Sequence, residues 1–120
     1  MRIRMLCLLA TSAAAGWLAA CVTPAAGNTC SKDDECPDGQ QCLTEFKGGY
    51  CGSKGCTKQE DCTDDTICVV LDGTNYCFLK CVEKADCNQN RPAEQAANCV
   101  SSIVAVGSNS SKACVPPSGS

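Results

Sequence analysis

The sequence predicts a small disulfide-rich protein built from tandem four-cysteine modules, each a short coil or turn segment plus a two-stranded β-hairpin, with little helix. The chain has 14 cysteines in 120 residues, a share typical of exported disulfide scaffolds. Leu, Ile, Val and Phe together contribute only 15 of residues 21–120, too few to offset the conformational entropy lost on folding. One cysteine spacing also recurs along the chain. Cross-links, rather than a hydrophobic core, are therefore expected to hold the fold.

Residues 1–20 are expected to be a secretory signal peptide. Arg2 and Arg4 form a positive start, an apolar stretch runs from Met5 to about Leu18, and small residues follow. This order of segments is that of a cleaved export signal. A membrane span would need a longer and more strongly apolar stretch, so an uncleaved N-terminal anchor is the less favoured alternative.

Residues 18–21 (LAAC) resemble the lipobox of bacterial lipoproteins, in which an aliphatic residue and two small residues precede a cysteine. The resemblance implies that Cys21 becomes the mature N-terminus and carries a diacylglyceryl group on its sulfur and a third acyl chain on its amine. Two or more chains are enough for stable anchoring in a bilayer. Val22 follows the cysteine where Asp would favour retention at the inner membrane, so the resemblance favours the outer membrane.

The alternative is ordinary signal-peptidase cleavage, either after Ala20 or near residues 25–27. The number of cysteines favours lipidation. With Cys7 removed in the leader and Cys21 used as the lipid carrier, twelve cysteines remain, an even number. Residues 21–29 contain small residues, Pro and Gly, and are expected to form a flexible tether.

From residue 30 onward, one cysteine unit occurs three times, at 30–52, 56–78 and 81–115. The first two units share the spacing C-x5-C-x5-C-x8-C, whereas the third keeps only the first x5 and then expands. Each has a lysine in its first loop and an acidic residue before its second cysteine. The twelve cysteines expected in disulfides are Cys30, Cys36, Cys42, Cys51, Cys56, Cys62, Cys68, Cys77, Cys81, Cys87, Cys99 and Cys114.

Each unit is expected to end in a β-hairpin, because β-forming residues flank a glycine-containing turn. The expected outgoing strand, turn and return are 43–46, 47–49 and 50–51 in unit one, 68–71, 72–73 and 75–78 in unit two, and 100–106, 107–110 and 112–115 in unit three.

The half of each unit before its third cysteine is polar and rich in turn formers. Coil or single helical turns are expected there, with Glu35, Asp61 and Asp86 capping them or forming Asx-turns. The insert 88–98 of unit three carries Pro92 ahead of Ala and Glu, which favours one or two helical turns. Residues 116–120 are expected to be a disordered tail.

Four cysteines allow three pairings, and the spacing does not choose among them. Pairing the first with the third and the second with the fourth is favoured because it ties the polar half of a unit to its hairpin. Each such bridge is worth about 3 kcal/mol in the chain-entropy model. The linkers 52–55 and 78–80 are too short for independent tumbling, so a rod-like row of modules without a common core is expected.

Two motifs carry a family resemblance, CSKDDECPDGQQC with Cys51 and CTKQEDCTDDTIC with Cys77. They resemble the cysteine-rich repeats of lipoproteins from myxobacteria and related δ-proteobacteria, which are in turn similar to the N-terminal cysteine-rich domain of Dickkopf proteins. With the lipobox, the resemblance covers nearly the whole chain. It implies a scaffold and not a Wnt-pathway role, because no receptor-contact residues match and unit three departs from the spacing after Cys87.

Composition excludes several chemistries. The chain has no histidine, which removes imidazole catalysis and His-containing zinc sites. It also lacks the C-x2-C pair of redox enzymes. From residue 21 onward, 8 Lys and Arg face 13 Asp and Glu, a net charge of −5 that disfavours nucleic-acid binding. No enzyme activity, metal or cofactor is predicted.

A calcium site and capped, solvated turns are the two interpretations of the acidic residues. No run has the alternating layout of a calcium-binding loop, so caps are favoured. The acidic residues concerned are Asp33, Asp34, Glu35, Glu60, Asp61, Asp64 and Asp65.

The sequence thus predicts a lipid-anchored protein of the bacterial cell envelope that serves as a non-enzymatic binding or structural module. Its partners are the membrane, through the lipid on Cys21, and an unidentified extracellular protein. The alternative is a secreted protease inhibitor or extracellular ligand on the same scaffold, with 71–75 and 104–109 as the exposed loops. In a eukaryotic ligand, residues 109–111 would be an N-glycosylation acceptor.

Overall fold

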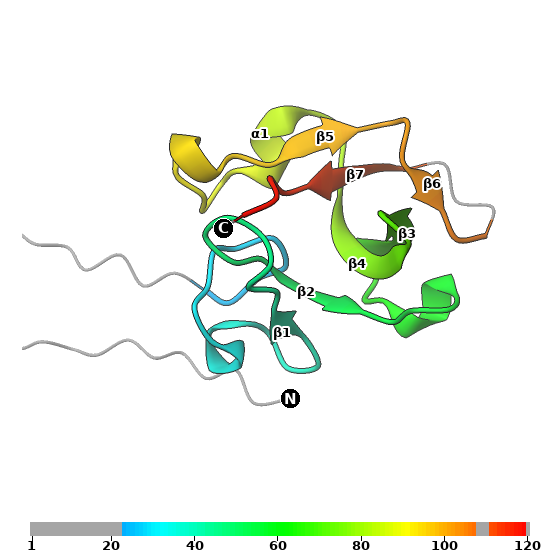
Figure 1. Cartoon of the computed structure of the whole chain (residues 1–120), viewed down its shortest axis with the longest axis horizontal. Coiled ribbons are helices and arrows are strands. Elements are labelled where there is room, and N and C mark those ends of the chain that lie inside the picture. The colour runs from blue at the N-terminus through cyan, green and yellow to red at the C-terminus, as the bar shows by residue number, and fades with distance from the viewer. Residues whose placement is uncertain (1–22, 108–110, 120) are drawn as a thin grey trace, which may run out of the picture.

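The computed structural model describes residues 23–107 and 111–119 of the chain. Antiparallel strands dominate, and every helix in these ranges is a single turn (Figure 1). The predicted class, a small disulfide-rich fold with little helix, is confirmed. The elements are β1 (Gln41–Cys42), β2 (Cys51–Lys54), β3 (Thr66–Leu71), β4 (Thr74–Cys81), β5 (Asn98–Val100), β6 (Val104–Ala105), β7 (Lys112–Val115), α1 (Lys84–Cys87) and the 3₁₀ turns η1 (Asp33–Glu35), η2 (Gln59–Asp61) and η3 (Ala93–Gln95).

Strand β4 joins the three units into one sheet. The main path runs β1-β2-β4-β3-β6, and β7 pairs with both β4 and β5. All these pairings are antiparallel. The eight residues of β4 begin in unit two and end at Cys81, the first cysteine of unit three. The units therefore share strands and do not form the predicted rod-like row.

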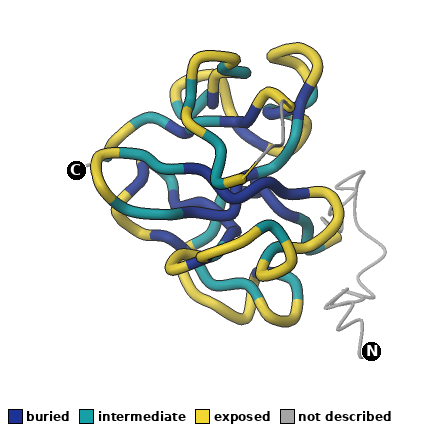
Figure 2. Tube along the Cα trace, turned by 90° about the vertical axis from the view of Figure 1, so that its right-hand side faces the viewer, coloured by how far each residue is buried: buried dark blue, intermediate teal, exposed yellow. Residues whose placement is uncertain are grey.

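The expectation of no common core was wrong. Phe46 and Tyr50 of unit one meet Tyr76 and Phe78 of unit two, and Ala113 of unit three joins the same cluster. The Phe46 ring packs edge-on against the other three rings at centroid distances of 5.3–6.3 Å. Buried residues gather along the central strands, while exposed residues occupy the surrounding loops (Figure 2). A small number of apolar residues is enough to form this core, because the sheet brings residues from all three units together. Two tyrosines add their rings to the cluster.

The hairpin of unit two is the one that the sequence predicted. Cys68 lies opposite Cys77 in the β3–β4 register. Asp72 and Gly73 form the turn with φ of 49° and 79°, the positive values that a two-residue hairpin turn requires.

Unit one differs from the prediction. Its outgoing strand is β1, which ends at Cys42, so residues 43–46 belong to the loop and not to a strand. Leu43 and Phe46 are both buried in the core. This three-residue spacing suits a turn that sends both side chains inward, whereas alternation along a strand would place them on opposite faces.

Unit three splits its expected outgoing strand in two. Strand β5 pairs with β7, whereas β6 leaves this hairpin and pairs with β3 of unit two. The return strand is confirmed as β7. Most of the expected turn, residues 108–110, lies outside the described residues.

The C-terminal tail is ordered in the described residues, which corrects the expectation of disorder over 116–119. The Lys47 N–H donates to the Pro117 carbonyl at 3.0 Å, and the Gly119 N–H donates to Glu45 O at 3.0 Å. Ser118 also forms a β-bridge with Phe46. The tail therefore closes over the unit-one loop and adds a contact between the two ends of the repeat array.

Candidate functional site

The disulfide framework repeats one geometry three times. The first cysteine of each unit pairs with the third and the second with the fourth, which is the pairing that the sequence favoured. No cysteine in the described ranges is free. The bridges are Cys30–Cys42, Cys36–Cys51, Cys56–Cys68, Cys62–Cys77, Cys81–Cys99 and Cys87–Cys114, with Cα–Cα distances of 5.3–6.1 Å, within the ordinary range.

The strand register explains why these pairs form. The third and fourth cysteines of each unit lie directly opposite each other on paired strands, as Cys68 and Cys77 do. Each then reaches back to one cysteine of the preceding polar segment. Both bridges of a unit therefore tie its coil half to its hairpin, and neither links neighbouring units.

The sulfur atoms of each unit lie close together. Three of them, for example those of Cys30, Cys36 and Cys51, are within 4.8 Å of one another. Zinc and other soft metals bind the thiolate form of cysteine. In the oxidised chain these sulfurs are consumed in disulfides, so their role is cross-linking.

One carboxylate in each unit accepts hydrogen bonds from the residue four positions earlier. The Asp61 carboxylate accepts from the Thr57 N–H at 2.9 Å and from its hydroxyl at 3.1 Å. Glu35 does the same for Ser31, and Asp86 accepts from the N–H groups of Val82 and Glu83. These bonds lower the pKa of all three carboxyl groups.

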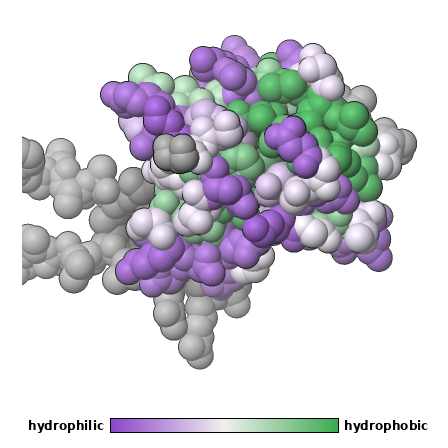
Figure 3. All heavy atoms as spheres, viewed as in Figure 1, coloured by the Kyte–Doolittle hydropathy of each residue, from purple (hydrophilic) through white to green (hydrophobic). Residues whose placement is uncertain are grey.

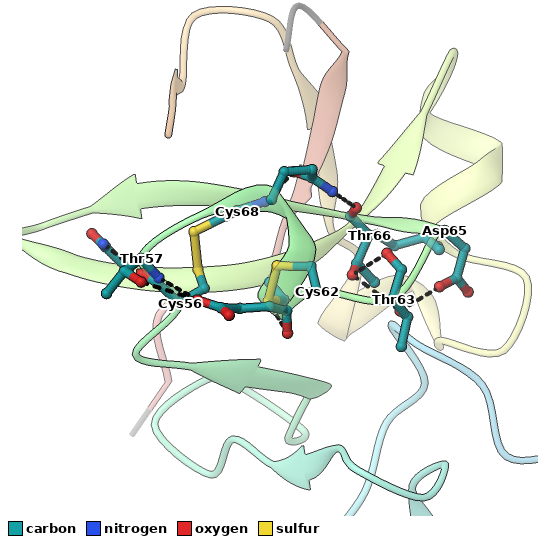
Figure 4. The surroundings of a disulfide bond; sticks show 12 residues. Cys56, Thr57, Cys62, Thr63, Asp65, Thr66 and Cys68 are labelled. Carbon is teal, nitrogen blue, oxygen red and sulfur yellow. Dashed lines mark hydrogen bonds between the residues drawn. A yellow bond between two sulfur atoms is a disulfide. The ribbon is translucent and has the colours of Figure 1, made fainter. Parts of the chain in front are cut away.

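Other acidic or amide groups of the same turns also bond their own chain. The Asp33 carboxylate accepts from the Cys42 N–H at 2.8 Å. Gln59 stands 26 residues later and accepts from the Cys68 N–H in the same way. The Thr63 hydroxyl donates to Asp65 at 2.6 Å (Figure 4). These side chains bond the backbone and side chains of their own turns. This is the role that the sequence favoured over calcium binding.

Residues 23–29, named here the anchor-proximal segment, are packed onto the body. The Gly27 N–H donates to Cys51 O at 2.8 Å and the Cys51 N–H donates to Asn28 O at 3.0 Å. Ala26 and Asn28 are buried, and the Asn28 amide donates to Thr23 O at 3.0 Å. The segment is therefore not the free tether that the sequence predicted for 21–29.

Arg91, from the insert of unit three, fastens this segment. Its guanidinium donates to the carbonyls of Gly27, Gly49, Lys47 and Gln95 at 2.8–3.2 Å. It also lies 5.5 Å from the centroid of the Tyr50 ring, a cation–π distance. Burial lowers the pKa of Arg91, and carbonyl dipoles rather than a carboxylate balance its charge.

Tyr50 completes this junction from the core side. It is fully buried, and its hydroxyl accepts a hydrogen bond from the Leu79 N–H at 3.1 Å. Burial raises the pKa of the Tyr50 hydroxyl far above its ordinary value. One aromatic side chain therefore contacts Arg91 of the insert, the aromatic core and the linker between units two and three.

The sequence predicted one or two helical turns in the insert but not the role of Arg91. The 3₁₀ turn η3 does form over Ala93–Gln95. A signal was present, because Arg91 is the sole arginine after the leader and sits where unit three departs from the repeat. Its carbonyl partners are spread over the chain, so spacing alone could not reveal them.

Cys21 and the dipeptide Asn109-Ser110 lie outside the described residues. Within the described part of the chain, the large hydrophobic residues Val82 and Val104 are exposed, at 80% and 66%. A hydrophobic surface gathers at the end of the molecule that carries β6, while hydrophilic residues cover much of the rest of this face (Figure 3).

No family model, curated protein or solved structure matches the chain. In the described ranges, no helix has the length and apolar character needed to cross a bilayer.

Proposed function

We propose that this chain is an exported, lipid-anchored protein of the bacterial cell envelope that acts as a rigid, non-enzymatic binding or structural module. The observation that carries the proposal is a lipobox-like LAAC motif directly ahead of a body in which all twelve later cysteines pair with one another. Disulfides persist in oxidising compartments outside the cytoplasm. The twelve cysteines of the described body pair among themselves, which agrees with the even number expected if Cys21 carries the lipid.

A presenting role, rather than a catalytic one, suits the side chains of the body. Catalysis by the common routes needs a positioned acid, base or nucleophile in a cleft. Here the carboxylates of Glu35, Asp61 and Asp86 cap turns, and the Arg91 guanidinium is used up in the fold. A cross-linked surface instead suits binding, because little entropy is lost when a rigid surface meets a partner.

Metabolic labelling with a palmitate analogue tests the anchor. The native chain and Cys7→Ala should both be labelled, because Cys7 lies in the leader and is removed. Cys21→Ala should lose the label and leave the membrane fraction. Equal labelling of native protein and Cys21→Ala would rule out acylation at this cysteine. Density-gradient separation of the membranes then tests the preference for the outer membrane.

A protease inhibitor is the second candidate, favoured by the exposed Val104 side chain on the short strand β6. The other predicted loop, 71–75, is less suited because its positive-φ turn at Asp72 and Gly73 is not extended. Incubation with a panel of serine proteases, using Val104→Asp as the matched control, tests this. Inhibition by the native chain that Val104→Asp abolishes would support it, and no inhibition at micromolar protein would dispose of it.

A further inference from the structure

We propose that the anchor-proximal segment and the insert 88–98 form a clamp that holds the acylated N-terminus against the body. The insert end of the molecule would then lie on the headgroups of the bilayer in one fixed orientation. This inference rests on the lipid anchor proposed above and goes beyond it, because it assigns a membrane-facing surface and an outward-facing one.

The contacts of the clamp are dense and connect distant parts of the chain. Arg91 donates to Gly27 O at 3.2 Å, across 64 residues of sequence, and the Asn90 amide donates to the Asn28 side-chain oxygen at 3.1 Å. The insert is itself closed, since Asn88 and Ala97 exchange two hydrogen bonds at 2.7–2.9 Å. Neither partner of the clamp is therefore a loose loop.

The clamp also explains why unit three departs from the repeat. Eleven residues separate Cys87 from Cys99, whereas five separate the equivalent cysteines of units one and two. The added residues supply both Asn90 and Arg91. The longer spacing of unit three thus provides the side chains that bind the anchor-proximal segment.

Chain length places the anchor close to this surface. Thr23 is fixed by the bond from Asn28, and the two residues from Thr23 back to Cys21 span at most about 7 Å. A lipid on Cys21 would therefore leave no slack for the body to swing away from the bilayer.

The anchor, and not charge, places the insert against the lipid. Arg91 is buried in the fold, whereas Gln89 and Glu94 of the insert are exposed. The exposed face of the insert therefore presents an amide and a carboxylate, and the short link to Cys21 holds this face near the headgroups.

The opposite end of the molecule then points away from the membrane. Figure 1 places the first described residues and η3 at one end of the body, and β6 at the other. Val104 of β6 is exposed, and it would be presented outward together with the hydrophobic surface at this end of the molecule (Figure 3). A partner protein would reach this surface without contacting the lipid.

Single-tryptophan variants test the orientation, because Trp17 lies in the leader and the mature chain has no other tryptophan. Full-length Gln89→Trp and Val104→Trp are expressed with their lipid and reconstituted into vesicles that contain a phosphatidylcholine with a nitroxide on its headgroup. Gln89→Trp should lose most of its fluorescence, and Val104→Trp should stay close to its value in nitroxide-free vesicles. A six-residue Gly-Ser insertion after Val22 should restore much of the fluorescence of Gln89→Trp.

The outcomes separate the two proposals. Acylated protein in which both tryptophans are quenched equally, or in which the insertion changes nothing, overturns the clamp and leaves the anchor standing. Protein whose mass shows no acyl chains overturns the anchor and the clamp with it. Mass analysis of each variant for six intact bridges confirms that the substitutions leave the framework unchanged.

Discussion

Arg91 is a charged side chain that the fold uses as a structural joint. A guanidinium presents five donors in a rigid plane and stays protonated even when buried. At position 91 it satisfies four backbone carbonyls from three separate segments and leaves only 7% of its surface exposed. The bonds to the Gly27 and Gly49 carbonyls are buried, and a buried carbonyl that loses its partner costs free energy, so the arginine stabilises the fold beyond its own contacts.

Replacing Arg91 should therefore lower the free energy of unfolding. The size of the loss should depend on how many carbonyls the new side chain can bond, and not on its charge. Arg91→Met keeps much of the volume but leaves the carbonyls unpaired, and should lower the free energy of unfolding by at least about 2 kcal/mol. Arg91→Lys keeps the positive charge but not the planar set of N–H donors of a guanidinium. It should therefore recover only part of the stability that Arg91→Met loses. Urea unfolding with the bridges intact measures both. A lysine variant as stable as the native chain would contradict the account.

Gly49 is the second residue whose identity the packing dictates. Its φ is +72°, and a Cβ atom there would overlap the backbone carbonyl of Cys30. Gly39 has a similar φ of +83° but open space around it, which makes it a matched control. Gly39→Ala should lower the free energy of unfolding by about 1–2 kcal/mol. Gly49→Ala should lower it clearly more, which the midpoints of urea unfolding measure. Equal losses of stability in the two variants would show that the backbone near Cys30 can move to accommodate the added Cβ atom.

At the scale of elements, the recurring unit is a capped turn followed by a strand cysteine. The carboxylates of Glu35, Asp61 and Asp86 each accept a hydrogen bond from the backbone N–H of the residue four positions earlier. Local chemistry of this kind is legible in sequence because donor and acceptor are four residues apart. The turns and the β3–β4 hairpin were accordingly predicted. The bridge pairing was only favoured among the three pairings that four cysteines allow, because it ties the polar half of a unit to its hairpin.

These turns predict a dependence of stability on pH. Each carboxyl group has a pKa below its ordinary value, 3.8 for Asp and 4.5 for Glu. The stability they contribute is therefore present above those values and is lost as the pH falls through the lower, folded-state pKa. Thermal unfolding between about pH 7 and about pH 2 should show the loss.

A triple variant provides the control for the pH dependence. Glu35→Gln, Asp61→Asn and Asp86→Asn keep an oxygen acceptor at each turn but remove the titrating group. Their combination should flatten the acid limb of the stability profile. An unchanged acid limb would assign the pH dependence to other carboxylates.

Elements that depend on distant partners were not predictable from the sequence. Strand β6 pairs with β3 of another unit, and the tail bonds the loop of unit one. Neither pairing leaves a local signal, because the partners are far apart in sequence. The same holds for Arg91, whose acceptors lie up to 64 residues away.

At the scale of the whole molecule, the disulfide bridges stabilise each unit and the aromatic core holds the units together. The six described bridges lie within units, so they cannot fix one unit against another. The aromatic cluster of Phe46, Tyr50, Tyr76 and Phe78 does that, together with β4. A count of Leu, Ile, Val and Phe missed this core because it left out the two tyrosines.

A single unit should therefore not find its native bridges reliably. A peptide of residues 56–78 lacks Phe46 and Tyr50, which cover its Tyr76 and Phe78. Oxidative refolding of this peptide should give a mixture of bridge isomers, whereas the chain from residue 22 onward should give one dominant species. Reversed-phase chromatography with mapping of the bridges measures this. One native isomer from the isolated unit would show that the units fold independently.

The mature protein should be an acylated body closed by six bridges. Intact-mass analysis of protein extracted from membranes, with alkylation before and after reduction, reads out the lipid and the bridges together. We expect a chain that begins at Cys21 and carries the mass of its acyl chains, with no alkylated thiol before reduction and twelve on residues 30–114 after it. Free thiols in the folded protein would rule out the six bridges, and a chain without acyl mass would rule out the anchor.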